Sequence, residues 1–158
     1  MRVLVLGYGN PSRQDDGAGH VLAWLVARAI RKYGDEAVLW RGHQLLPEAV
    51  LEAEDIDVAV FCDASLLSYD EGYALERVEP SKSGADGLNI HTFGPGSVLA
   101  FAAEILGRVP DGLMLSVSGD SFDFSDRLTP TCKERVRKAC RSFGEFWKEY
   151  RESQIRPS

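Results

Sequence analysis

The chain has little of what marks several classes of protein. Its 158 residues include three cysteines and three histidines, and no Cys-x-x-Cys pair, which argues against a zinc ribbon or a redox dithiol. Cys132 and Cys140, if they share a helix, lie about 12 Å apart, whereas a disulfide needs Cα atoms within about 7 Å. No apolar run approaches the about 18 residues of a membrane span. We therefore expect reduced thiols and no membrane insertion.

Positive charge is also scarce. Lysine and arginine number 18 against 24 aspartates and glutamates, so the formal net charge is −6. Nucleic-acid-binding domains usually carry a basic surface, and nucleic acid is therefore not an expected partner. The first apolar run, residues 3–6, is too short for the apolar region of a signal peptide. We expect a cytoplasmic protein.

The pattern that is present alternates strands with helices. Apolar runs predict strands at 2–6, 37–40, 57–62 and 113–117, with an edge strand at 73–78. Helical periodicity and capping residues predict helices at 16–31, 47–53, 96–106 and from Pro130, capped by Thr129, to about Tyr150. Runs that are apolar throughout predict an α/β three-layer sandwich, with a mostly parallel twisted sheet and helices on both faces. We expect one domain over residues 1–150 and a frayed tail at 151–158.

A glycine- and aspartate-rich segment follows the first predicted strand. Residues 7–19 read Gly-Tyr-Gly-Asn-Pro-Ser-Arg-Gln-Asp-Asp-Gly-Ala-Gly. They hold the first two glycines of a G-x-G-x-x-G fingerprint, but Ser12 stands in place of the third and no phosphate-binding lysine follows. Asp15 and Asp16 would repel a phosphate where it needs a positive helix end. A nucleotide- or phosphate-binding enzyme is therefore an alternative and not the leading hypothesis.

Three residues that are distant in sequence could form a metal site. In open α/β sheets, ligands bind beyond the carboxyl ends of the strands, where Asp16, Asp63 and His91 are expected. Two carboxylates and an imidazole with an open position suit an exchangeable metal. Each residue also has an alternative role without a metal: Asp16 as a helix N-cap, Asp63 as a turn residue and His91 as a hydrogen-bonded loop residue. His20 is expected to pair with Asp16 or to be solvated, and His43 to be a loop residue. Without a G-x-S-x-G elbow, a serine nucleophile is not expected.

Several blocks of sequence together resemble one family, the hydrogenase maturation proteases. The resemblance spans about residues 2–145, in the family's order and spacing. Its opening block is the most distinctive and each later block is weak alone. The matching blocks are Val5–Gly19, Gln44–Glu48 (Gln-Leu-Leu-Pro-Glu), Val60–Ala64 (Val-Phe-Cys-Asp-Ala), the His-Thr-Phe-Gly-Pro run at 91–95 and Leu128–Thr131 (Leu-Thr-Pro-Thr).

The resemblance implies an endopeptidase of aspartic or metal-dependent type. Such enzymes remove a C-terminal extension from the large-subunit precursor of a nickel–iron hydrogenase after nickel has been inserted. The family's metal-contacting positions fall on Asp16, Asp63 and His91, and the two aspartates are also the expected catalytic residues. Many relatives carry glutamate at the first position. Asp15 stands beside Asp16 here, and which of the two contacts the metal is left open.

The resemblance also implies what the protein binds. The nickel is carried by the precursor, no organic cofactor is needed, and zinc or cadmium could occupy the site in a crystal. Substrate contacts are expected at Gly9, Asn10, Asp15, His43, Gln44 and Thr92. A wider partner surface is expected at Gln44–Pro47, the loop at 81–94, Tyr8 and Phe93. The further alternative is a non-catalytic chaperone that holds nickel or the precursor.

Overall fold

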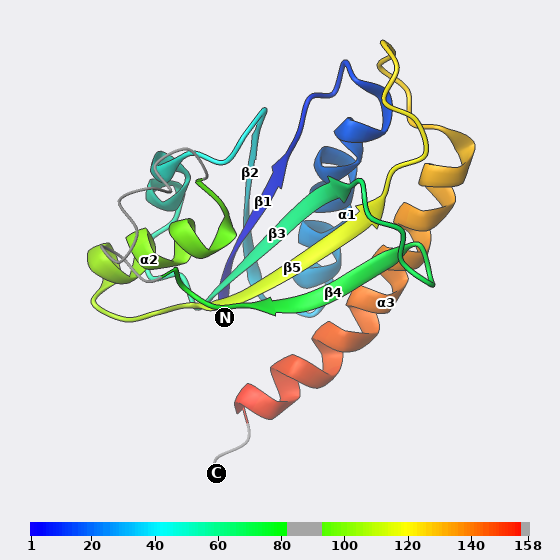
Figure 1. Cartoon of the computed structure of the whole chain (residues 1–158). Coiled ribbons are helices and arrows are strands. Elements are labelled where there is room, and N and C mark those ends of the chain that lie inside the picture. The colour runs from blue at the N-terminus through cyan, green and yellow to red at the C-terminus, as the bar shows by residue number, and fades with distance from the viewer. Residues whose placement is uncertain (82–92, 156–158) are drawn as a thin grey trace.

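Five strands form a single sheet in the order β2-β1-β3-β5-β4 (Figure 1). The structure is a computed structural model that describes residues 1–81 and 93–155. Pairing is parallel between β1 and β2, β1 and β3, and β3 and β5, whereas β4 is an antiparallel edge strand beside β5. The strands are β1 (Arg2–Tyr8), β2 (Glu36–Gly42), β3 (Val58–Ser65), β4 (Tyr73–Val78) and β5 (Asp111–Ser118).

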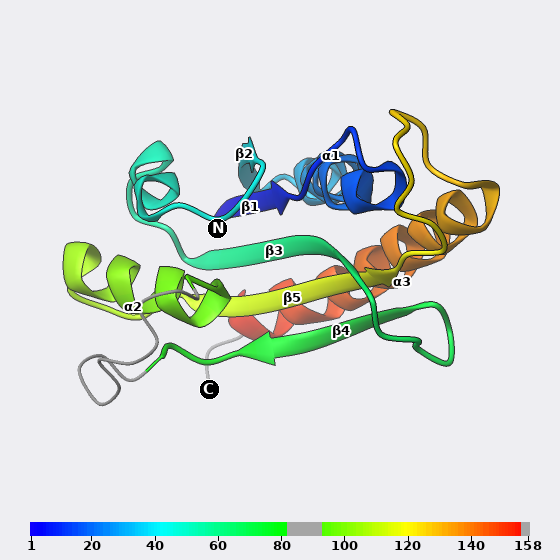
Figure 2. The ribbon, with the colours of Figure 1, turned by 45° about the horizontal axis from the view of Figure 1, so that its top comes forward.

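Helices cover both faces of the sheet, which confirms the predicted three-layer α/β sandwich (Figure 2). On one face, α1 (Ala18–Lys32) and α3 (Pro130–Ile155) pack on the odd-numbered side chains of β1 and β5, such as Val5 and Leu115. On the other face, α2 (Pro95–Leu106) and the 3-10 helix η2 (Pro47–Glu52) pack on Leu6 and Phe61. Because both faces are covered, the central strands are apolar throughout.

The third strand is longer than its apolar run predicts. β3 continues through Ser65, so Asp63 lies within the strand, in register with Ser116, and does not follow its end. The predicted strand, residues 57–62, ended just before Asp63. Parallel pairing uses backbone groups, and the ladder with β5 therefore continues past that point.

Helix α1 begins later than predicted. Asp16 lies in a 3-10 turn, η1 (Gln14–Gly17), and α1 starts at Ala18. Gly19, in its first turn, approaches two strands closely: a Cβ there would lie 2.5 Å from the Tyr8 carbonyl oxygen and 2.6 Å from that of Cys62. This glycine therefore lets α1 lie directly on the carboxyl ends of β1 and β3.

Helix α3 extends further than predicted. Thr129 caps it as expected, since its hydroxyl accepts a hydrogen bond from the Cys132 N–H at 3.2 Å. The helix then runs through Ile155, which corrects the expectation of a frayed tail over residues 151–155. Arg151 donates to Asp35 at 3.0 Å, and Tyr150 donates to Asp111. These tertiary contacts hold turns that have no apolar periodicity.

The three cysteines are unpaired, as predicted. Burial, followed by the charge of Asp63, raises the pKa of the Cys62 thiol, so this group is a poor nucleophile. In the ranges 1–81 and 93–155, no helix has the length and apolar character needed to cross a bilayer.

Candidate functional site

A pocket of about 440 Å³ opens where β1 and β3 end. Its charged members are Asp16 and Asp63, and His43 and Gln44 enter it from the segment after β2. Parallel strands end at the same edge of a sheet, and this edge brings together residues that are far apart in sequence. The other described lining residues are Tyr8, Gly9, Leu45, Phe93, Gly94, Pro95 and Met114.

Asp63 is the most perturbed carboxyl group of the pocket. Its pKa is raised to about 7 in all: burial raises it most, a hydrogen bond from the Ala64 N–H lowers it, and the nearby negative charge of Asp16 raises it. Asp16 and Asp63 therefore interact electrostatically as well as sharing a pocket. A cation placed between them would relieve both the repulsion and the desolvation.

The backbone of the glycine loop holds Asp16 in place. The Asn10 N–H donates to Asp16 Oδ2 at 2.7 Å. Gly9 adopts φ 132°, and a Cβ at this position would overlap the Asp16 carbonyl oxygen, so the close turn requires glycine. The Gly9 N–H also donates to the Gly42 carbonyl at 3.2 Å, which ties the loop to the end of β2.

His20 supports the same loop from α1. Its Nε2 lies 2.8 Å from the Gly9 carbonyl oxygen, and the contact is partly buried. The two expected arrangements, pairing with Asp16 or full solvation, are not what the structure shows. A histidine in the first turn of α1 instead fixes the backbone next to Asp16, a contact that sequence spacing alone does not indicate.

Asp15 has a different environment from its neighbour. It is fully buried, and its carboxylate accepts hydrogen bonds from the Thr129 N–H (2.8 Å) and hydroxyl (2.8 Å) and from the Asp120 (2.8 Å) and Ser121 (3.0 Å) N–H groups. Burial alone would raise its pKa, but these four donors outweigh burial and hold the pKa below its usual value. Asp15 thus joins the glycine loop to the segment before α3 and is not among the described lining residues of the pocket.

The turn that leads into the two aspartates is strained. Gln14 has φ 51°, in the left-handed region that a residue with a side chain seldom adopts. The Gln14 N–H donates to the Ser125 carbonyl at 2.8 Å, so the loop before α3 holds the turn from outside. Such strain persists only where surrounding contacts determine it, and it is commonly found at functional sites.

The structure brings together part of the predicted site. Gly9, Asp16, His43, Gln44 and Asp63 line one pocket, and Asn10 contributes its N–H to Asp16. The predicted residues at positions 91 and 92, His91 and Thr92, lie outside the described residues. Within the described part of the chain, no group of three or more histidine, cysteine, aspartate and glutamate side chains is arranged to hold a metal ion.

Two residues that line the pocket were not predicted as site residues from the sequence. Pro95 lies at the first position of α2, and Met114 lies in β5, where it accepts a hydrogen bond from the Tyr8 hydroxyl at 3.7 Å. Met114 alternates with Leu113 and Leu115, which face α1 and α3, so strand alternation was the available signal. Tyr8 and Phe93 were expected in a partner surface, and both line the pocket.

The charge of the pocket argues against a phosphate ligand. The residues described in its lining include two carboxylates and neither a lysine nor an arginine. A phosphate at this position would meet uncompensated negative charge, whereas a nucleotide site usually offers a helix N-terminus and a cation. The arrangement suits a cation or a partner that carries one.

These features define a class: a three-layer α/β protein with an acidic pocket at the carboxyl edge of a mostly parallel sheet. Neither a family model nor a curated protein matches the sequence. Solved structures do match the fold. The hydrogenase maturating endopeptidase HybD from E. coli is 21% identical, with a TM-score of 0.62 over 97% of this chain and 94% of that one.

Two archaeal structures are similar to the same extent. The [NiFe] hydrogenase maturation protease HybD from Thermococcus kodakarensis is 19% identical, with a TM-score of 0.60 over 92% of this chain and 99% of that one. The protease HycI from Thermococcus kodakarensis KOD1 is 21% identical, with a TM-score of 0.61 over 93% and 92%. The resemblance to the hydrogenase maturation proteases is thereby confirmed at the level of the fold, over nearly the whole chain.

Proposed function

We propose that this protein is an endopeptidase that removes a C-terminal extension from the large-subunit precursor of a nickel–iron hydrogenase. Water cleaves one peptide bond, which leaves a new carboxylate on the subunit and a new amine on the released extension. The observation that carries the proposal is the pair Asp16 and Asp63 in one pocket at the strand ends. The fold shared with HybD and HycI over more than nine-tenths of the chain supports the same reading.

The proposal assigns the nickel to the substrate. Asp16 and Asp63, together with His91, would complete the coordination of a nickel ion that the precursor already holds. Carboxylate and imidazole ligands suit such an ion. A pocket that binds the nickel-loaded precursor better than the nickel-free one selects the precursor that is ready for cleavage, because only a difference in affinity can discriminate between the two forms. The pocket itself then needs only weak affinity for free metal.

The loop contacts explain how the carboxylates would be presented. The Asn10 N–H donates a hydrogen bond to Asp16 Oδ2, and this bond fixes the orientation of the carboxylate. Gly9 and His20 fix the backbone from which it projects. His43 and Gln44 line the same pocket and would contact the peptide beside the metal. Tyr8 and Phe93 give it apolar walls that limit water around the reacting bond.

A cleavage assay tests this proposal. Purified protein is mixed with nickel-loaded or nickel-free precursor, and the product masses are determined. We expect a shortened subunit only with the nickel-loaded form, and its loss in Asp16→Ala, Asp63→Ala and His91→Ala. Asp70→Asn, an exposed change in the segment between β3 and β4, is the matched control and should cleave normally.

The assay also separates the alternative functions. A chaperone would bind the nickel-loaded precursor without shortening it, and a phosphate-binding enzyme would neither bind nor cleave it. If a correctly matched, nickel-loaded precursor remains uncut, the protease proposal is wrong.

A further inference from the structure

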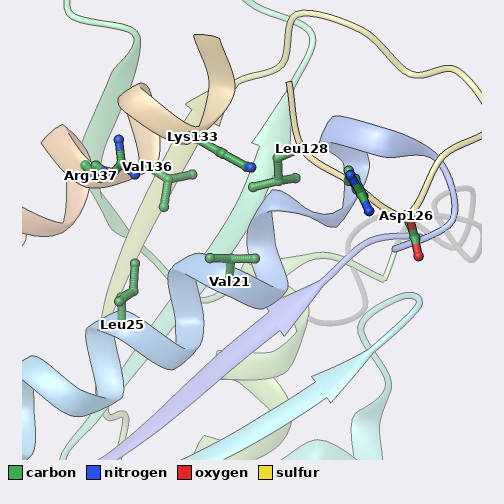
Figure 3. A pocket seen from close by; sticks show the side chains of 8 residues that line it. Val21, Leu25, Asp126, Leu128, Lys133, Val136 and Arg137 are labelled. Carbon is green, nitrogen blue, oxygen red and sulfur yellow. The ribbon is translucent and has the colours of Figure 1, made fainter. Parts of the chain in front are cut away.

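A second cavity, of about 410 Å³, lies between α1 and α3, on the opposite face of the sheet from α2 (Figure 3). Val21 and Leu25 project into it from successive turns of α1, and Val136 faces them from α3. Leu128, in the segment before α3, closes one end. We call this cavity the helix groove. It shares no described lining residue with the acidic pocket.

The floor of the helix groove continues the apolar core outward: Val136 is a buried core residue, Leu25 and Leu128 pack against the core, and Val21 remains exposed. Val21 and Leu25 belong to the apolar periodicity of α1, yet Val21 is 42% exposed and Leu25 is half-buried. Their helix neighbours Leu22 and Val26 are fully buried in the core. The apolar stripe of α1 is thus wider than the contact with the sheet and α3 requires. Exposed contiguous apolar surface with a polar rim is typical of interaction sites.

The rim of the helix groove is basic. Arg127, Lys133 and Arg137 line it and are exposed, against a single carboxylate, Asp126. Arg137 has one weak ion pair, 3.4 Å from Glu134, in which both side chains are exposed and little is gained. Among the described residues, the side chains of Arg127 and Lys133 form no ion pair. This excess of positive charge stands on a chain whose net charge is −6.

We propose that the helix groove binds an acidic peptide segment of a partner protein. One aliphatic or aromatic side chain of the segment rests on Val21 and on the exposed part of Leu25, above the buried Val136. Carboxylates on either side of it meet Lys133 and Arg137, which lie one helical turn apart. The sign of the rim determines the charge of the ligand, since electrostatic complementarity steers partners and rejects those of like charge.

The openness of the walls favours a peptide over a small molecule. Specific small-molecule sites enclose most of the ligand surface. Here Val21 and all the charged lining residues are exposed, so a small anion with an apolar tail would stay largely in solvent. A peptide can run along the groove between the two helices and bury only one anchoring side chain. This proposal does not depend on the protease activity.

Selection from a peptide library tests the proposal and does not require the partner to be identified. A random library displayed on phage is selected on the immobilised protein and counter-selected on Lys133→Glu. We expect enriched peptides to place aspartate or glutamate next to leucine, isoleucine or phenylalanine. Enrichment of basic peptides, or no enrichment over the counter-selected protein, would overturn the proposal.

A synthetic copy of the most enriched peptide then maps the site by fluorescence anisotropy. We expect Lys133→Glu and Val21→Glu each to weaken binding about tenfold, and added salt to weaken binding to the unaltered protein. Lys148→Glu makes the same charge change on an exposed position further along α3, outside the groove lining, and should bind normally. Equal loss in Lys148→Glu and Lys133→Glu would mean non-specific attraction and would contradict the proposal.

Two other occupants are separated by the same proteins. Dodecanoate that displaces the peptide and binds more tightly than it does would identify a lipid-like ligand and reject the peptide. If the protein forms dimers in size-exclusion chromatography and Lys133→Glu makes it monomeric, the occupant is a second copy of the chain and the proposal is rejected. Processing of a hydrogenase precursor should be unchanged in Val21→Glu, so failure of either proposal is recognised independently.

Discussion

Two neighbouring carboxylates, Asp15 and Asp16, lie in opposite kinds of environment. Asp15 is fully buried and receives four hydrogen bonds from residues more than 100 positions away. Asp16 lines an open pocket with Asp63, and the described residues provide its side chain with one hydrogen bond, from Asn10. The hydrogen-bonding capacity of the Asp15 carboxylate is thus filled, whereas the Asp16 carboxylate can still accept a hydrogen bond or bind a cation. A charge that serves the fold is surrounded by donors, whereas a charge that serves binding is not.

The largest expected effect comes from removing the satisfied carboxylate. Asp15→Ala removes a fully buried acceptor and leaves the Thr129, Asp120 and Ser121 donors without it, and we expect the free energy of unfolding to fall by about 4 kcal/mol. Urea denaturation followed by circular dichroism measures this. Asp123→Ala, an exposed change in the same loop, should cost under about 0.5 kcal/mol. Equal stability of the two variants would remove the contrast between the aspartates.

Removing an available carboxylate should affect activity and not the fold. If the proposed function is right, Asp16→Asn and Asp63→Asn each lower the rate of precursor cleavage by about 100-fold or more. Their urea midpoints should not fall, because each change removes a charge from a pair that repels. A time course of cleavage on gels, beside the urea midpoint of each protein, checks both halves. A variant that cleaves normally would lose its assigned role.

The two carboxylates should also respond to pH with opposite signs. The pKa of Asp63 is raised to about 7 on folding, so its ionisation destabilises the fold progressively between about pH 4 and 7. Asp63→Asn should therefore gain up to about 4 kcal/mol at pH 8 and little at pH 4. The pKa of Asp15 is lowered, so its contribution is present above its unfolded pKa and is lost as the pH falls through the folded value.

Denaturation at several pH values measures these contributions. For Asp63→Asn, a gain that is the same at pH 4 and pH 8 would mean that the ionisation of Asp63 is not its cause.

The smallest expected effect lies behind the pocket. His20→Ala removes the contact with the Gly9 carbonyl and should cost about 1 kcal/mol of stability. Because Gly9 adjoins the backbone that holds Asp16, we also expect cleavage to slow several-fold. His20→Gln can donate a hydrogen bond to the same carbonyl and should recover part of the rate. Recovery of stability without recovery of rate would limit His20 to a structural role.

The sequence predicted more of the fold than of the site, for physical reasons. Apolar runs marked the central strands β1, β3 and β5 because a sheet covered on both faces buries most of their side chains. The convergence of Asp16 and Asp63 was predictable because parallel strands end at one edge. The environment of Asp15 was not, since its donors come from a distant loop. The last turns of α3 were also missed, because Asp35 and Asp111 stabilise them from outside the helix.

The contact between Asp35 and α3 has a practical consequence for anyone who shortens or labels this protein. Asp35 accepts hydrogen bonds from the Trp147 indole at 3.1 Å and from Arg151 at 3.0 Å, next to the turn that leads into β2. Asp35 also pairs with the N-terminal ammonium group at 3.0 Å. A chain cut after residue 150 would therefore lose one of the two cations that pair with Asp35, although residues 151–155 carry no apolar periodicity. An affinity tag or fluorophore is best attached after position 155, where it leaves the contacts of Asp35 with Trp147 and Arg151 intact.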